Sequence, residues 1–86
     1  MVASYFQISP EELVGQVRKK EIMIPRQVCM YLARRELSQS FERIGEELGG
    51  RNHTTVMHAC DKVVRRIKKD RKLLMDINAI KKEMGL

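Results

Sequence analysis

The amino-acid sequence predicts a compact, all-α domain that contains a helix-turn-helix. No segment sustains the apolar–polar alternation of a half-buried strand, whereas several segments repeat apolar residues at steps of three and four. Two adjacent glycines, Gly49 and Gly50, separate two such segments, and glycine most readily takes the positive φ of a tight reversal. The length of 86 residues suits one domain with a modest core of four or five helices.

The first helices are marked by local signals. Residues 1–6 look like the last turns of a helix. Ser9 is a good N-cap, Pro10 follows at the first helical position, and Glu12 stands three residues after the cap, which is the spacing of a capping box. We therefore expect a short helix from Pro10 to about Gly15.

A basic loop is expected next, over about residues 16–23, with Pro25 opening the following helix at its first turn. The loop carries three consecutive cations: Arg18, Lys19 and Lys20. The buried face of the following helix is predicted by an apolar stripe: Val28, Cys29, Leu32, Ala33 and, further on, Leu37.

Residues 40–69 predict the helix-turn-helix. Ser40 is a plausible N-cap for a helix of about two turns, and the glycine pair ends that helix. A second helix, expected to be the longest of the chain, begins near His53. One of its faces is apolar: Val56, Ala59, Cys60, Val63 and Ile67.

A last helix is predicted after Asp70, which can act as its N-cap, and Gly85 follows its end. Its inward stripe is expected to contain five residues: Leu73, Leu74, Ile77, Ile80 and Met84.

Composition restricts the class of protein. The net charge of +6 favours a polyanionic partner, although a basic balance alone is weak evidence because many solvated helix surfaces are rich in lysine. Cys29 and Cys60 lie among apolar residues, so we expect small buried hydrophobes and no disulfide or metal site. No apolar run approaches the roughly 20 residues of a membrane span, and the N-terminus lacks a signal-peptide pattern, so we expect a cytoplasmic protein.

The start of the second helix of the helix-turn-helix carries the side chains that could read DNA. A threonine methyl, as at Thr54 or Thr55, can pack on the methyl group of thymine, and the threonine hydroxyl can bond a base or a phosphate. His53 has the reach for a base edge. Asn52 can bond adenine or can simply cap the helix. The alternative is that Asn52 only caps the helix and that the threonines after it contact no DNA.

The cations around this segment could contact phosphates. Arg51 precedes the helix and Lys62 lies two to three turns along it, whereas the later cations, among them Arg65 and Lys69, suit a solvated face. The basic loop could place Arg18 in an adjacent minor groove, or it could be a solvated charge run.

Enzymatic chemistry finds little support. His53 and His58 stand five apart with no acidic residue between them, so they do not form the H-E-x-x-H zinc motif, and His58 is expected to pack inside. A phosphate-cradling G-x-x-x-x-G-K motif is also absent from the sequence. The chain is therefore not expected to be an enzyme.

Three segments resemble one known family. Residues 49–63 read GGRNHTTVMHACDKV, residues 24–34 read IPRQVCMYLAR, and FQIS and EELV stand at residues 6–9 and 11–14. These segments are similar to the C-terminal DNA-binding domain (domain IV) of the bacterial replication initiators of the DnaA family. The resemblance covers nearly the whole chain, and it implies a Trp-repressor-like helix-turn-helix that binds double-stranded DNA at the DnaA box, a nonamer of the TTATNCACA kind found at replication origins.

The resemblance also implies roles for individual residues. The base-reading group is Arg18 in the minor groove, Asn52, His53, Thr54 and Thr55 in the major groove, and Phe41 against a thymine methyl. For the DNA backbone the resemblance implies Arg26 and Gln27. Together with the cations expected from their position, the expected phosphate contacts are Lys19, Lys20, Arg26, Gln27, Arg34, Arg51 and Lys62. In the full initiators an ATP-binding AAA+ module precedes this domain, so ATP and magnesium are expected only there, and this chain is expected to hold no cofactor or metal.

Two residues depart from the family pattern. Asn52 stands where the family usually has aspartate, which accepts a hydrogen bond from a cytosine amino group, so base preference there can change. Glu42 replaces a proline, and its carboxylate would repel nearby phosphates. A second hypothesis remains open: the isolated domain, expected to be a monomer, could dock acidic phospholipid or a replication regulator through its basic, amphipathic last helix.

Overall fold

Six helices and no strand make up the part of the chain that the computed structural model describes, residues 2–16 and 18–85. The all-α prediction is confirmed. Met1, from the helical segment expected at the N-terminus, and Val17, from the basic loop, lie outside the described residues. The helices are α1 (Val2–Tyr5), α2 (Pro10–Val14), α3 (Lys20–Glu36), α4 (Phe41–Glu47), α5 (His53–Ile67) and α6 (Arg71–Glu83).

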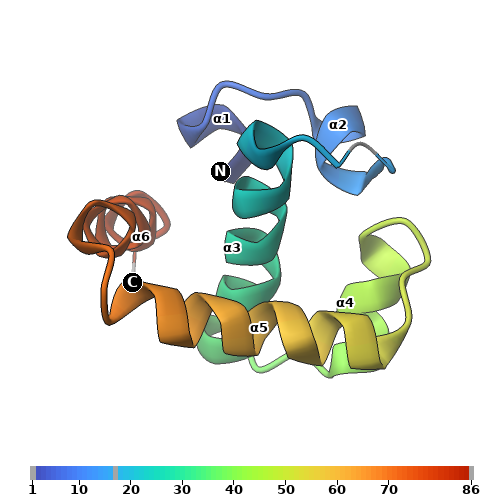
Figure 1. The fold of residues 1–86 in the computed structure, drawn as a ribbon. Coiled ribbons are helices and arrows are strands. Elements are labelled where there is room, and N and C mark those ends of the chain that lie inside the picture. The colour runs from blue at the N-terminus through green and yellow to red at the C-terminus, as the bar shows by residue number, and fades with distance from the viewer. Residues whose placement is uncertain (1, 17, 86) are drawn as a thin grey trace.

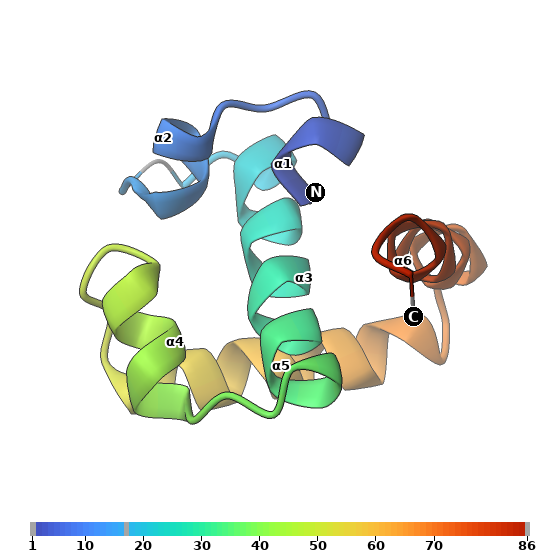
Figure 2. The ribbon, with the colours of Figure 1, turned by 180° about the vertical axis from the view of Figure 1, so that it is seen from behind.

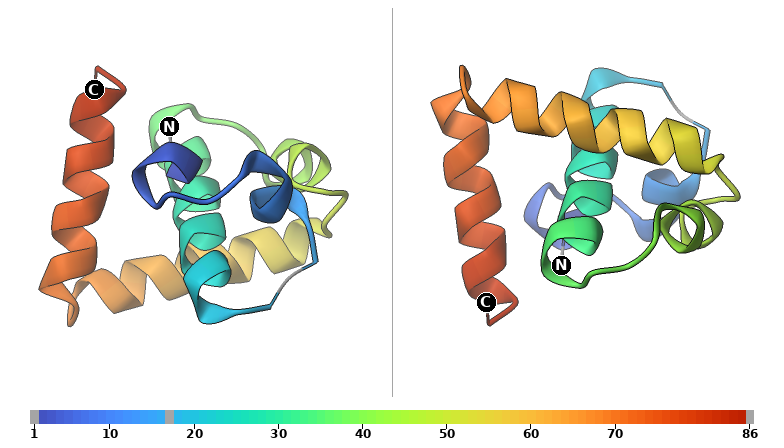
Figure 3. Two further views of the ribbon diagram at one scale, coloured as in Figure 1. Left: turned by 90° about the horizontal axis from the view of Figure 1, so that it is seen from above. Right: turned by 90° about the horizontal axis from the view of Figure 1, so that it is seen from below.

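Helix α3 stands at the centre of the molecule (Figure 1). The short helices α1 and α2 lie around its N-terminal end, and α5 crosses its C-terminal half (Figures 1 and 2). Helix α4 packs beside the start of α5, whereas α6 turns back from the far end of α5 and runs along one side of the molecule (Figure 3). The two halves of the helix-turn-helix are therefore α4 and α5.

Two apolar clusters lie on opposite sides of α3. One joins α1, α3, α5 and α6 through buried residues: Val2, Val28, Leu32, Val63, Leu73, Ile77 and Ile80. The other joins α2, α3, α4 and α5: Leu13, Met30, Ile44, Leu48, Val56, Ala59 and Cys60. Cys29 packs against both clusters, and neither cysteine forms a disulfide. The central helix thus links the helix-turn-helix to the rest of the core.

The predicted N-caps are confirmed in the structure. Ser9 forms the full capping box with Glu12, its Oγ accepting from the Glu12 backbone N–H at 3.1 Å. The other caps also accept backbone N–H groups: Ser40 from Arg43 at 3.1 Å, Asn52 from Thr54 at 2.7 Å, and Asp70 from Leu73 at 3.0 Å. These local bonds set the start of four helices.

The expected start of α3 is wrong. The helix begins at Lys20, so Pro25 lies five residues inside it, and the basic loop is shorter than residues 16–23. Proline in this early part of a helix removes one hydrogen bond, and burial of Ile22 favours the extra turn. Lys19 is an N-cap without a side-chain capping bond, so the sequence carries no signal for this start. Because of the extra turn, α3 with 17 residues is longer than α5 with 15.

Two residues of the predicted stripes are exposed. Leu37 retains 52% of its accessible surface, because it lies at the C-cap of α3, where the chain leaves the core, and Ser38 has a positive φ. Leu74 is 37% exposed, since it lies beside the buried line of Leu73, Ile77 and Ile80. A membrane-spanning length of apolar helix is found nowhere in residues 2–16 and 18–85.

Candidate nucleic-acid interface

The turn between α4 and α5 is tightly built. Gly49 and Gly50 both take the left-handed region, with φ of +87° and +73°. The Arg51 backbone N–H donates to the carbonyl of Gly45 at 2.8 Å, and a Cβ at Gly45 would overlap the Arg51 carbonyl group. The absence of a side chain at Gly45 therefore lets the turn close over α4 and fixes how α5 starts.

The first turn of α5 presents its side chains to solvent. Asn52, His53, Thr54 and Thr55 are all exposed. The side-chain oxygen Oδ1 of Asn52 serves as the cap. The side chains of His53, Thr54 and Thr55 make no hydrogen bond within the described part of the chain. A helix N-terminus also carries partial positive charge from its unpaired N–H groups. This tip therefore offers an imidazole and two hydroxyl groups to an anionic partner.

The basic loop lies near the same face of α5. Its first exposed cation, Arg18, lines a hollow of about 420 Å³ together with Thr55 and Lys62 of α5 and Gln27 of α3. Lys19 and Lys20 are exposed at the N-terminus of α3. We call this space the loop–helix hollow. It brings the minor-groove candidate Arg18 together with one major-groove candidate, Thr55, whereas Asn52, His53 and Thr54 do not line it.

His58 belongs to this surface and not to the core. It was expected to pack inside, but it is exposed and lines the loop–helix hollow. The reason is helical geometry: Thr55, His58 and Lys62 stand at intervals of three and four residues and share one face. The same spacing in the sequence could have revealed this.

Two predicted phosphate contacts have another role in the structure. The buried Arg26 donates from Nε to the Leu13 carbonyl at 2.7 Å and from Nη2 to the Glu12 carbonyl at 2.8 Å. Arg51 donates to the carbonyls of Val14, at 3.0 Å, of Gly15 and of Leu48. The two guanidinium groups thus satisfy the carbonyls at the end of α2, and we call them the arginine clamp.

The clamp replaces the hydrogen bonds that α2, with five residues, cannot supply to its own C-terminal carbonyls. Burial lowers the pKa of both guanidinium groups, and for Arg26 the nearby charge of Arg51 adds to this effect. Arg26 is only 7% exposed, and although it lines the loop–helix hollow together with Arg51, its guanidinium group is held by the carbonyls of α2. The clamp ties the start of the basic loop to the start of α5.

Phe41 and Arg34 lie together at the junction of α3 and α4. The guanidinium carbon of Arg34 is 4.4 Å from the centroid of the Phe41 ring, a cation–π contact, and Nη1 donates to the carbonyl of Gln39 at 3.2 Å. Phe41 is half-buried against the second apolar cluster. Neither residue lines the loop–helix hollow, so they form a separate small surface beside α4.

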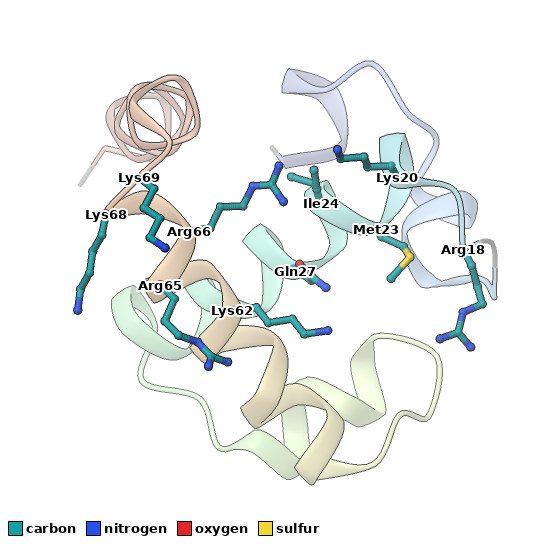
Figure 4. A pocket seen from close by; sticks show the side chains of 10 residues that line it. All are labelled: Arg18, Lys20, Met23, Ile24, Gln27, Lys62, Arg65, Arg66, Lys68 and Lys69. Atoms are coloured by element: carbon teal, nitrogen blue, oxygen red, sulfur yellow. The ribbon is translucent and has the colours of Figure 1, made fainter.

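A second and larger hollow, of about 730 Å³, opens between α3 and the C-terminal half of α5 (Figure 4). We call it the basic groove. Seven cationic side chains and no carboxylate line it: Arg18, Lys20, Lys62, Arg65, Arg66, Lys68 and Lys69. The sequence suggested only a solvated face for the last four. The spacing of Lys62, Arg65, Arg66 and Lys69, three and four residues apart, was the signal for a common face.

The described residues contain no cluster of three or more His, Cys, Asp or Glu side chains placed to hold a metal ion. Burial raises the pKa of the Cys29 and Cys60 thiols, which keeps them in the unreactive thiol form. The polar groups that line the two hollows are cations, amides, a hydroxyl group and an imidazole.

An all-α fold, a glycine turn and an exposed second helix define a protein of the helix-turn-helix class. The chain belongs to the DnaA family: the family described as "Bacterial dnaA protein helix-turn-helix" matches residues 1–63.

Individual relatives agree with this assignment. The chain is 54% identical over 70 residues to the chromosomal replication initiator protein DnaA of Lactobacillus johnsonii, which covers 81% of the chain and 15% of that protein. It is 48% identical over 80 residues to the DnaA of Thermomicrobium roseum, which covers 93% of the chain and 17% of the relative. For Levilactobacillus brevis DnaA the identity is 47% over 83 residues, which cover 96% of the chain and 18% of the relative. The chain spans less than one fifth of the length of these relatives.

Proposed function

We propose that this chain binds double-stranded DNA sequence-specifically, at DnaA-box nonamers of a replication origin, and performs no chemistry itself. The observation that carries the proposal is the exposed tip of α5, where His53, Thr54 and Thr55 face solvent and Thr55 shares the loop–helix hollow with Arg18 of the basic loop. A helix-turn-helix reads base edges with the N-terminal residues of its second helix. Membership in the DnaA family supports a role in the initiation of chromosome replication, in the cytoplasm and at the nucleoid.

Each part of the surface has a task in this proposal. Thr54, Thr55 and His53 contact bases in the major groove, and Arg18 enters the adjacent minor groove. Five further side chains are placed to neutralise phosphates: Lys19, Lys20, Gln27, Arg34 and Lys62. Phe41 offers an apolar edge to a thymine methyl. Arg26 and Arg51 hold the loop in register, and because both also line the loop–helix hollow, their predicted phosphate contacts stay a separate prediction.

The first test removes single base-reading groups. His53→Ala or Thr54→Ala is expected to cost about 1–3 kcal/mol on a DnaA-box duplex and little on a random duplex, because base contacts add energy only at the matching sequence. Lys62→Ala is expected to weaken both duplexes alike, since a phosphate contact carries no sequence information. Fluorescence anisotropy at one fixed salt concentration measures all three variants.

An exposed residue away from this surface provides the control: Asn78→Ala on α6 should bind as the unchanged protein does. Equal losses on cognate and random duplexes for His53→Ala and Thr54→Ala would show that the tip of α5 does not read sequence.

Asn52 offers a second test, because one side chain has two tasks. Its carbonyl oxygen already accepts from Thr54 at 2.7 Å, which leaves the amide N–H groups for a base. Asn52→Asp keeps the cap, adds about 0.3–1 kcal/mol of stability at the helix N-terminus, and replaces a donor by an acceptor. We expect preference at the contacted base pair to move toward a cytosine amino group. Competition among duplexes that differ at one base pair measures the change, and an identical preference in both proteins would contradict it.

Docking of α6 on acidic phospholipid or on a regulatory protein has weaker support. Leu73, Ile77 and Ile80 of its apolar stripe are buried in the first cluster, so they are not available to a membrane or a partner. The structure leaves Leu74 and the more exposed Met75 on the outside of this helix. Two neighbouring side chains are a small apolar surface, and DNA binding is the better-supported function.

A further inference from the structure

We propose that the C-terminal half of α5 binds the phosphate backbone of DNA that flanks the sequence read by the tip of this helix. The site is the basic groove, and its ligand is a run of backbone phosphates, whatever the base sequence. The inference rests on the proposed function and extends it: the chain would contact a longer stretch of duplex than the nonamer alone.

The first argument is the lack of internal partners in the groove. Of its seven cations, Arg66 alone pairs with a carboxylate, that of Asp70 at 3.4 Å, within the described part of the chain. Three cations elsewhere on the molecule do pair with carboxylates: Arg43 with Glu47, Lys72 with Asp76 and Lys81 with Glu36. Like charges gathered without carboxylates repel one another, and a polyanion in the groove relieves this repulsion.

The second argument is the shape of the groove. Met23, Ile24 and Gln27 of α3 form its inner wall, and Lys62 and Arg66 extend toward this wall from α5 (Figure 4). Arg18 lies on the opposite side, on the basic loop. Charged groups beside apolar surface are less screened by water than fully exposed ones. The groove is therefore a lined channel with charge on two sides.

The third argument is continuity with the proposed reading surface. Arg18 and Lys62 line both the loop–helix hollow and the basic groove, so the two spaces adjoin. From Thr55 to Arg66 the helix axis rises about 16 Å, which corresponds to roughly five nucleotide steps along one strand at about 3.4 Å each. A duplex that fills the first space therefore has phosphates near the second, about five steps from the base at Thr55. These phosphates lie in the flanking DNA when the tip reads bases in the half of the nonamer next to that flank.

The experiment compares two charge-matched variants of the whole chain. Arg65→Gln with Lys69→Gln removes two positive charges from the groove, and Arg71→Gln with Lys82→Gln removes two from exposed positions on α6. Binding is measured against salt on a duplex trimmed to the nonamer and on one extended by about ten base pairs, one helical turn, at each end. Thermal unfolding checks that each variant keeps its fold.

We expect the groove variant to lower the slope of log K against log salt by roughly 1.8 on the extended duplex, since each lost phosphate contact removes about 0.9. Its affinity deficit should then shrink about tenfold between roughly 50 and 200 mM salt. On the trimmed duplex the groove variant should match the unchanged protein, and the α6 variant should show neither effect on either duplex.

Several results would overturn the proposal. Equal slopes for the two variants on the extended duplex would mean that net charge alone is responsible. An equal deficit of the groove variant on the trimmed and extended duplexes would place its contacts inside the nonamer. A groove variant that binds DNA normally but loses binding to vesicles containing phosphatidylglycerol would assign the groove to a lipid surface. In these cases the unchanged protein still prefers the nonamer, whereas loss of that preference would refute the proposed function as well.

Discussion

Replacing Gly49 with alanine is expected to cost about 2–5 kcal/mol of unfolding free energy, a large part of the stability of a domain of this size. Two effects add up. The φ of +87° is a conformation that costs an L-residue about 1–2 kcal/mol. An added Cβ would also overlap the carbonyl oxygen of Val14 and approach Nη1 of Arg51 at 2.9 Å. The turn would have to move away from the end of α2 and so loosen the arginine clamp.

Gly50 supplies a matched control in the next position. Its φ of +73° is similar, but a Cβ there would meet nothing within 4 Å. Gly50→Ala should therefore cost only the conformational part, about 1–2 kcal/mol. Urea unfolding followed by circular dichroism gives both values. If the two alanine variants were equally stable, the close approach at Gly49 would have no energetic importance.

The sequence was most informative where structure is decided locally. The caps at Ser9, Ser40, Asn52 and Asp70 depend on residues three or fewer positions apart, and all four are present. The glycine turn is equally local, because positive φ strongly favours glycine. The start of α5, and with it the exposed tip, could therefore be predicted without a structure.

The roles of the arginines could not be predicted in this way. Arg26 and Arg51 bind the carbonyls of residues 12–15, which are more than ten positions away in the sequence. A sequence shows that an arginine is basic but not whether an unpaired helix end lies beside it. From the sequence alone, without knowledge of tertiary contacts, solvent and DNA phosphates are the expected partners of both arginines. The hydrogen bonds to these carbonyls give both arginines a structural role that the sequence did not reveal.

The basic groove was missed for a related reason. Its cations come from the loop, from α3 and from α5, and only the fold brings Arg18 opposite Arg66. The helical spacing along α5 indicated a charged face, but a charged face opposite an apolar stripe usually means solvent. The facing wall of α3 is what makes this face a groove.

The arginine clamp leads to the second large effect. Arg26→Met is expected to cost about 2–5 kcal/mol of unfolding free energy, because the buried carbonyl of Leu13 and the part-buried carbonyl of Glu12 would lose their donors at about 1–3 kcal/mol each. Methionine fills much of the space of the arginine stem, so the loss reports mainly on hydrogen bonding. The matched change Arg43→Met removes an exposed i,i+4 ion pair and should cost about 0.5 kcal/mol or less.

The same variant separates a holding role from a DNA-contacting role. If Arg26 only holds the end of α2, then Arg26→Met that remains folded should bind the DnaA box more weakly while its salt slope stays close to that of the unchanged protein. A phosphate contact would instead lower the slope by about 0.9. We expect the loss of affinity because Arg18 lies in the loop that directly follows α2. If α2 is loosened, this loop must be ordered again when the protein binds DNA, and that ordering costs free energy. A stability equal to that of Arg43→Met, together with a reduced slope, would return Arg26 to the DNA surface and contradict the clamp.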